Sequence, residues 1–218
     1  MIKQGSLRPV SRLENAQAMR RLTPRGAATR ARIVAAALEL MYVKSVNATT
    51  LDDVRAASNV SKSQLYNHFA DKEQLVRAVV EARAAQVLER ERGYLQRLKS
   101  FHGLIRWRNA LVQRNALQNG AYGCGLGSMA SELADQDEEA RSTLAESFSE
   151  WEGLLAAGLR RMQDSGVLKQ DADPQKLATG LMAALQGGYL LAETAHDITP
   201  MEVALDMALE HVRSFLTS

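Results

Sequence analysis

The residues best suited to binding chemistry lie close together, between Ser61 and Lys72. This segment, SKSQLYNHFADK, brings hydroxyls, amides, an imidazole and two lysines into one short stretch. Such groups hydrogen-bond to phosphate oxygens and to the edges of DNA bases. A helix that buries Leu65 and Phe69, which are four residues apart, leaves these donors on its other face. The pattern therefore predicts a short helix that presents polar side chains to a nucleic acid.

Other candidate chemistry is weaker. The four histidines are scattered without the spacing of a zinc site. The segment GCGLGS (123–128) lacks the Gly-Lys-Ser/Thr ending of a phosphate loop, and no strand precedes it. Cys124 lies just before an expected helix start, where a thiolate is stabilised. It is therefore either a redox or electrophile sensor or simply a small buried residue, and the sequence leaves both roles open. We expect no enzymatic activity, no cofactor and no metal.

Charge is distributed unevenly along the chain. Residues 1–72 carry twelve Lys and Arg against five Asp and Glu, whereas residues 73–218 carry fifteen against twenty. A basic first third predicts contact with a polyanion, although an arginine-rich disordered start has the same signature. The single cysteine fits a reducing compartment, and the most apolar segment (178–192) is too short to span a membrane. We expect a cytoplasmic protein without a membrane partner.

Two short helices are predicted to position the polar cluster. Thr50 can cap a helix that begins at Leu51, with Asp53 at the capping-box position, and Ser61 can cap the next helix. Between them, Asn59 tolerates the left-handed conformation that a tight turn needs. Two short helices joined by a turn of about three or four residues are typical of the helix-turn-helix motif.

The rest of the chain is also predicted to be helical. Apolar residues recur at three- and four-residue steps from Thr29 onward, and Ser128 can cap a helix after the glycine-rich break. We find no convincing strand, so the predicted fold class is all-α. It consists of an N-terminal three-helix domain with the helix-turn-helix, followed by a larger helical domain. Helices of the larger domain are expected over 101–117, 137–166, 174–195 and 199–215.

The segment TTLDDVRAASNVSKSQLYNHFADKEQL (49–75) resembles the DNA-binding core of the TetR family of bacterial transcriptional regulators. The matching features are the Thr-Thr pair, LDDV, Val-Ser-Lys, and Tyr-x-His-Phe followed by Lys-Glu. GCGLGSMASELAD and LMAALQGGYLLA are similar to effector domains of one branch of the family. Two positions depart from the family pattern: Ser45-Val46 stands where Gly-Tyr or Gly-Phe is usual, and Ser58-Asn59 where Ala-Gly is usual.

This resemblance implies a ligand-responsive repressor that binds a pseudo-palindromic double-stranded operator as a homodimer and is released by a small-molecule effector. Ser63 and Gln64, early in the helix, are placed to reach base edges. Ordinary helix packing is the alternative for Tyr66 and His68. The contacts that resemble phosphate contacts are Thr50, Tyr66, His68 and Lys72. The full set of expected DNA contacts is Thr50, Ser61, Lys62, Ser63, Gln64, Tyr66, Asn67, His68 and Lys72.

The resemblance also implies an organisation for the chain: a flexible basic arm over 1–24, a DNA-binding domain over 25–72, and an effector-binding and dimerisation domain over 73–218. A mostly apolar effector pocket is expected from Trp107, Tyr122, Cys124, Met129, Phe148, Trp151, Met182, Gln186 and Tyr189. The last two helices are expected to pair with their symmetry mates through Leu181, Gly187, Gly188, Leu191, Val203 and Val212. For both sets, the alternative is that the residues fill the core of one chain.

Two other classes of function compete with this interpretation. An all-helical enzyme lacks a catalytic constellation in the sequence. A nucleoid-type, non-specific DNA binder is expected to be basic throughout, whereas residues 73–218 are net acidic. Titration with random and operator DNA separates the regulator from the non-specific binder.

Overall fold

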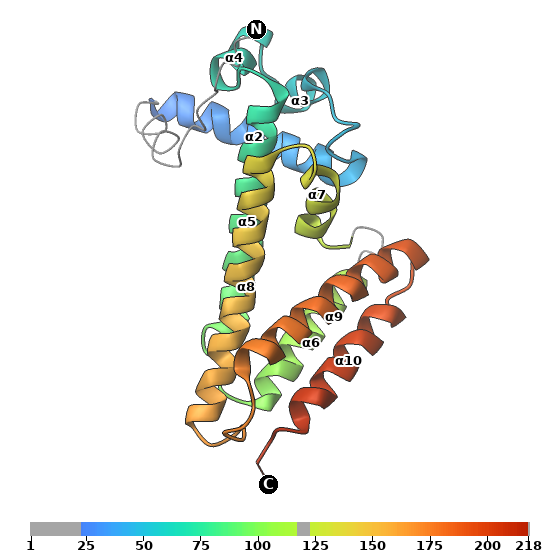
Figure 1. Cartoon of the computed structure of the whole chain (residues 1–218). Helices are drawn as coiled ribbons and strands as arrows, with labels where there is room; N and C mark the ends of the chain where they lie inside the picture. The colour runs from blue at the N-terminus through green and yellow to red at the C-terminus, as the bar shows by residue number, and fades with distance from the viewer. Residues whose placement is uncertain (1–22, 117–122, 218) are drawn as a thin grey trace, which may run out of the picture. The chain divides into compact units, whose positions relative to one another are not determined.

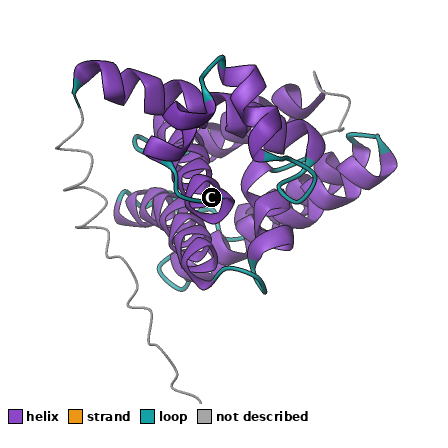
Figure 2. Cartoon of the chain, turned by 90° about the horizontal axis from the view of Figure 1, so that it is seen from above, coloured by secondary structure: helices purple, strands orange, loops and turns teal. Residues whose placement is uncertain are grey.

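The computed structural model describes residues 23–116 and 123–217 of the 218-residue chain. Within these ranges the structure is helical, and the one extended pairing is an isolated bridge between Leu168 and Leu216 (Figure 2). The all-α prediction is confirmed. None of the described helices combines the length and the apolar character that crossing a bilayer requires. The helices (Figure 1) are α2 (Pro24–Lys44), α3 (Leu51–Ser58), α4 (Lys62–His68), α5 (Lys72–Leu95), α6 (Phe101–Ala116), α7 (Gly125–Leu133), α8 (Glu138–Asp164), α9 (Pro174–Ala195) and α10 (Thr199–Arg213).

Helix α2 begins earlier than the apolar periodicity predicts. The Thr23 hydroxyl accepts a hydrogen bond from the Gly26 N–H at 3.2 Å, and Pro24 occupies the first turn. Proline suits that position because its missing N–H would have no partner there and its φ is already helical. The start expected at Thr29 is therefore wrong, since residues 25–28 are helical without an apolar period. The expected arm over 1–24 overlaps α2 at its end, and residues 1–22 lie outside the described residues.

The chain divides into two compact units, residues 1–79 and 80–218. The boundary falls inside α5, beyond residue 72, where we placed the end of the DNA-binding domain. A helix that starts in one unit and continues in the other belongs to both, so the sequence cannot assign it to a single domain. The functional roles given to the two parts remain predictions.

In the first unit, reciprocal capping boxes define α3 and α4. The Thr50 hydroxyl accepts from the Asp53 N–H at 3.1 Å, and the Asp53 carboxylate accepts from the Thr50 N–H at 3.0 Å. The same exchange joins Ser61 and Gln64 at 3.1 and 2.9 Å. Each box satisfies two backbone donors that the first turn of a helix leaves open. Asn59, between the helices, adopts the left-handed conformation with φ of 50°, so the predicted caps and turn are confirmed.

The short helix α4 is held by its apolar face. Leu65 and Phe69 are each 1% exposed, as the sequence predicts, and Val60 is buried with them. Arg32 fixes the preceding helix, because its Nε donates to the backbone oxygen of Ser58 at 3.0 Å. A seven-residue helix is too short to be stable alone. These contacts therefore position α4 and set which of its faces is presented outward.

Ser45 stands in a strained backbone conformation at the end of α2, with φ of 79° and ψ of 161°. This region of backbone space is open to glycine and costly for other residues. The adjacent Val46 is buried at 2% exposure. The departure from the Gly-Tyr or Gly-Phe pattern thus keeps an apolar anchor in place, and it adds backbone strain at the serine.

In the second unit, α9 and α10 form an antiparallel pair joined by a short loop (Figure 1). Their backbones approach closely at Gly188, where a Cβ would lie 2.9 Å from the Cα of Met201. Helix α7 begins at Gly125, and Ser128, which we expected to cap it, lies inside the helix. The Ser128 hydroxyl instead donates to the Cys124 carbonyl at 3.1 Å.

A fully buried carboxylate joins α5 to α6 within the second unit. Glu91 accepts hydrogen bonds from Trp107 Nε1 at 2.9 Å, from Arg90 Nε at 3.0 Å and from Arg114 Nη1 at 3.4 Å. A buried charge is tolerated when it is paired and hydrogen-bonded in this way. The large indole of Trp107 is therefore held by a polar contact as well as by packing.

Candidate DNA interface and effector cavity

The outward face of α4 collects the polar side chains that the sequence predicts to contact DNA. Because Leu65 and Phe69 are buried, the residues around them point away from the core of the first unit. His68 and Lys72 are partly exposed. The exposed members of the predicted set are Thr50, Ser61, Lys62, Ser63, Gln64, Tyr66 and Asn67. The fold thus presents the whole predicted set at the surface of one unit, and their contact with DNA stays a prediction.

Gln64 is engaged in the cap of its own helix. Its Oε1 accepts from the Ser61 N–H at 2.9 Å. Recognition of adenine by glutamine uses the amide oxygen and nitrogen together. To read adenine in that manner, Gln64 must release the cap, whereas with the cap kept it offers only its Nε2 donor. Sequence reasoning identified both roles of this position separately and could not show that they compete.

The cationic groups beside α4 differ in how they are held. Lys72 Nζ donates to the backbone oxygen of Asn47 at 3.2 Å, and Lys62 Nζ lies 6.0 Å from the centre of the Tyr66 ring. Partial burial, and then the positive charge of Arg30, lower the pKa of His68 below its ordinary value. At neutral pH the imidazole is therefore uncharged in the DNA-free protein and offers one N–H donor.

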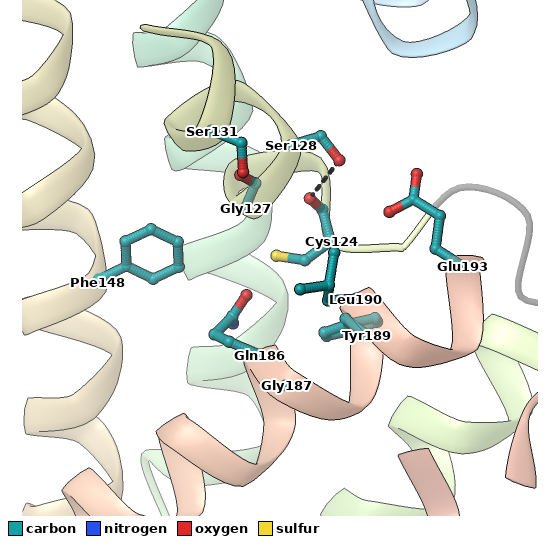
Figure 3. A pocket seen from close by; sticks show the side chains of 10 residues that line it. All are labelled: Cys124, Gly127, Ser128, Ser131, Phe148, Gln186, Gly187, Tyr189, Leu190 and Glu193. Carbon is teal, nitrogen blue, oxygen red and sulfur yellow. Dashed lines mark hydrogen bonds between the residues drawn. The ribbon is translucent and has the colours of Figure 1, made fainter. Parts of the chain in front are cut away.

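A cavity of about 400 Å³ lies in the second unit among α7, α8 and α9 (Figure 3). Volumes of roughly 300–1,000 Å³ are typical of small-molecule sites. Phe148 reaches in from α8, Gln186 and Leu190 rise from α9, and the Cys124 thiol points between them (Figure 3). The lining residues are Cys124, Gly127, Ser128, Ser131, Phe148, Gln186, Gly187, Tyr189, Leu190 and Glu193.

The cavity includes some of the residues expected for an effector pocket and omits others. Cys124, Phe148, Gln186 and Tyr189 line it, and Tyr122 lies outside the described residues. The expected residues that do not line it, and that are instead buried in the core, are Trp107, Met129, Trp151 and Met182. Sequence reasoning missed the small and polar side of the cavity, and one residue of its apolar wall, Leu190. The small and polar residues are Gly127, Ser128, Ser131, Gly187 and Glu193. The small residues of GCGLGSMAS leave space beside a helix, and this feature of the sequence could have indicated the missed part of the lining.

Burial governs the ionisable groups of the cavity. It raises the pKa of the Cys124 thiol, so less of this cysteine is thiolate at neutral pH than of a free cysteine. The pKa of the Tyr189 hydroxyl is raised mainly by the same cause. Burial also raises the pKa of Glu193. No group of three or more His, Cys, Asp or Glu within residues 23–116 and 123–217 is arranged to hold a metal ion.

The residues expected at a dimer interface divide into two groups. Leu181, Gly188 and Val212 pack inside the chain, with Leu181 and Val212 each 1% exposed, so they serve its own core. Leu191 and Val203 are exposed, as is Gly187, beside which a Cβ would meet open space. The large apolar residues exposed on α9 and α10 are Leu190, Leu191, Val203 and Met207.

Comparison with known families matches both parts of the chain. Residues 33–79 match the model of the bacterial regulatory proteins of the tetR family. Residues 95–208 match the model of the tetracyclin repressor-like C-terminal domain. The second match alone extends over more than half of the 218 residues.

Individual relatives align along most of their length. A transcriptional regulator from the lacX 3′ region of Lactococcus lactis subsp. lactis is 26% identical, over 82% of this chain and 90% of the relative. The transcriptional repressor DhaR of Mycobacterium sp. (strain GP1) is 25% identical, over 83% and 90%. The crystal structure of a TetR transcriptional regulator from Chloroflexus aurantiacus superposes with a TM-score of 0.79 at 25% identity, over 89% of this chain and 98% of that one.

Proposed function

The chain belongs to the TetR family of bacterial transcriptional regulators, and from this premise we propose that it is a ligand-responsive repressor. In this proposal it acts in the cytoplasm, binds a pseudo-palindromic operator as a homodimer, and is released from DNA by a small-molecule effector. The observation that carries the proposal is the outward face of α4, which is fixed by the capping box of Ser61 and Gln64 and by the buried Leu65 and Phe69.

We assign two kinds of DNA contact to this surface. Ser63 and Gln64, in the first turn of α4, read base edges in the major groove, as residues near the start of a recognition helix do. A second group of contacts binds phosphates and fixes the register of the protein on the duplex without reading sequence. These are made by Thr50, Lys62, Tyr66, His68 and Lys72.

Dimerisation follows from the limited reach of one recognition helix. Seven helical residues contact few base pairs, so specificity needs two half-sites at a spacing that the dimer sets. The exposed apolar residues of α9 and α10 support a second copy of the chain as the partner for this surface. Leu191 and Val203 remain in the proposed interface, whereas the buried Leu181, Gly188 and Val212 leave it.

The proposed switch runs from the cavity to α5. Helix α7 supplies Gly127, Ser128 and Ser131 to the cavity. The first residue of that helix packs against α5, because a Cβ on Gly125 would lie 3.2 Å from Arg83 Nε. A ligand that moves α7 therefore acts on a helix whose N-terminal part belongs to the DNA-binding unit. Coupling of this kind typically amounts to about 1–3 kcal/mol, or about 5–150-fold in affinity, and it is reciprocal.

Sequencing of the DNA that the purified full-length protein selects from a random library tests the proposal. We expect an inverted repeat with two equivalent half-sites. Enrichment of unrelated sequences would identify a non-specific DNA binder instead. Failure of the protein to retain DNA at low salt would contradict the proposal that it binds DNA.

A further inference from the structure

The cavity among α7, α8 and α9 combines an apolar wall with an acidic end. Phe148, Tyr189 and Leu190 supply the apolar wall. Glu193 stands beside the Cys124 segment, near the C-terminal end of α9 (Figure 3). Its carboxylate packs so closely against Gly123 that a Cβ there would collide with it, and the φ of 56° at Gly123 also favours glycine. Glycine at position 123 therefore leaves room for this carboxylate beside the Cys124 segment.

The carboxylate of Glu193 is partly buried and makes no ion pair or hydrogen bond with another described residue. Desolvation of a carboxylate is costly unless a cation or several donors compensate it. The described lining contains no lysine or arginine, and the nearby His196 is exposed. The positive charge of His196 acts against the rise in the Glu193 pKa, and the described lining itself supplies no counter-charge to this carboxylate.

The two serine hydroxyls of the lining also favour a ligand that donates hydrogen bonds. Ser128 Oγ donates to the Cys124 carbonyl at 3.1 Å, and Ser131 Oγ donates to the Gly127 carbonyl at 3.1 Å. A hydroxyl that has used its proton offers a ligand only its lone pairs. Gln186 adds an amide that can face a ligand with either its oxygen or its nitrogen.

We propose that the effector of this cavity is a small organic cation, an amine or amidine carried on an apolar or aromatic body, whose charged group pairs with Glu193. The body packs against Phe148, Tyr189 and Leu190, and the N–H groups donate to Glu193 and to the serine oxygens. An anionic ligand of the same shape is disfavoured by the Glu193 charge. The lining itself contains no lysine or arginine among the described residues, and the Arg90 charge acts on Cys124 and Tyr189 from outside it. The inference rests on the proposed function, since it names the effector class of that site.

Three probes with one phenyl ring and one straight chain test the charge preference: phenylbutylamine, phenylbutanol and phenylbutyrate. Their binding to the full-length protein is measured by titration calorimetry at neutral pH. We expect the amine to bind at least about tenfold more tightly than the alcohol, and the carboxylate to bind most weakly. Equal or tighter binding of the carboxylate, or no binding by any of the three, would overturn the proposal.

Two variants assign the preference to one side chain. Glu193→Gln is expected to remove the advantage of the amine over the alcohol and to leave alcohol binding unchanged. Glu89→Gln makes the same chemical change on an exposed side chain of α5 that does not line the cavity, and it is expected to keep the wild-type order. An unchanged amine preference in Glu193→Gln contradicts the assignment.

Operator affinity, measured with and without the amine, separates this inference from the proposed function. If the amine binds as expected and operator affinity does not change, the cavity does bind organic cations, but ligand binding there does not control DNA binding. If another compound releases the DNA while the amine does not bind, ligand-controlled release of DNA is supported and the proposal of an organic cation is contradicted.

Discussion

The side chain of Gln64 serves the fold of α4 and, in our proposal, the recognition of DNA. These roles can be separated, because glutamate at this position keeps the oxygen that accepts from the Ser61 N–H and loses the amide donor. We expect Gln64→Glu to retain the stability of the wild-type protein within about 0.5 kcal/mol. Its preferred DNA sequence is expected to change at one base pair in each half-site. Selection and sequencing with this variant, and with Gln64→Ala as the variant that loses both roles, provide the measurement. An unchanged consensus for Gln64→Glu would contradict the assignment of Gln64 to base reading.

Ser45 offers a test of backbone strain. With φ of 79° and ψ of 161°, it occupies a region that costs a non-glycine residue about 1–3 kcal/mol. Glycine removes this strain, but its greater freedom in the unfolded chain lowers the free energy of unfolding by about 0.4–1 kcal/mol. We therefore expect Ser45→Gly to raise the free energy of unfolding by about 1 kcal/mol in urea titrations followed by circular dichroism. Both variants lose the hydrogen bond that the Ala48 N–H donates to the Ser45 hydroxyl, and Ser45→Ala also keeps the strain, so it should show no gain. A loss of stability in the glycine variant would mean that the strain is absent in solution.

At the scale of helices, the buried carboxylate of Glu91 holds α5 against α6. Glu91→Ala leaves the indole N–H of Trp107 without its acceptor, while Arg90 and Arg114 are exposed enough to regain water. We expect this variant to lose about 2–4 kcal/mol of unfolding free energy. Glu89→Ala, on an exposed face of the same helix, should stay within about 0.5 kcal/mol of the wild type. Similar values for the two variants would show that the Glu91 contacts do not stabilise the second unit.

Some helix starts are encoded in a few adjacent residues and could be predicted from the sequence, although the Thr23 cap and Pro24 of α2 were overlooked. Thr50 and Ser61 cap α3 and α4 through side chains that the sequence displays, so both helices and the turn at Asn59 were predicted correctly. The start of α7 could not be found in this way, because its N-cap, Cys124, makes no capping hydrogen bond with its side chain. Local capping chemistry is visible in a sequence, and helices that begin without it are set by packing.

The lining of the cavity depended on contacts between distant segments. Phe148 and Trp151 are three residues apart on α8, so helical periodicity places both on one side, yet only Phe148 lines the cavity. Leu181 and Leu191 on α9 are likewise both apolar, and one is buried within the chain while the other is 57% exposed. Periodicity identifies an apolar face, and it does not reveal whether that face meets the same chain, a ligand or a second copy.

At the scale of the whole molecule, dimerisation is expected to depend on the exposed apolar residues of α9 and α10. A charge at Leu191 must be desolvated when two copies meet, so we expect Leu191→Glu to shift the protein to a monomer at micromolar concentration. Multi-angle light scattering gives the mass directly. Val43→Glu places the same charge on an exposed apolar residue of α2 and should retain the dimer mass. A wild-type protein that is already monomeric would refute the proposed dimer, and a dimeric Leu191→Glu would exclude Leu191 from its interface.

The basic first third of the chain, with twelve Lys and Arg against five Asp and Glu in residues 1–72, supports attraction to any DNA. Charge alone therefore does not distinguish a regulator from a non-specific binder. Specific recognition requires that the two copies of α4 meet matching bases at a fixed spacing. The distinguishing quantity is the ratio of two affinities rather than either affinity alone.

The most direct measurement is the affinity of the purified protein for its selected operator and for a scrambled duplex of the same composition, by fluorescence anisotropy at physiological salt. For a sequence-specific regulator we predict that the operator binds at least about 10³-fold more tightly than the scrambled duplex. Equal affinities for the two duplexes would contradict the account, because the outward face of α4 would then contact phosphates without reading bases.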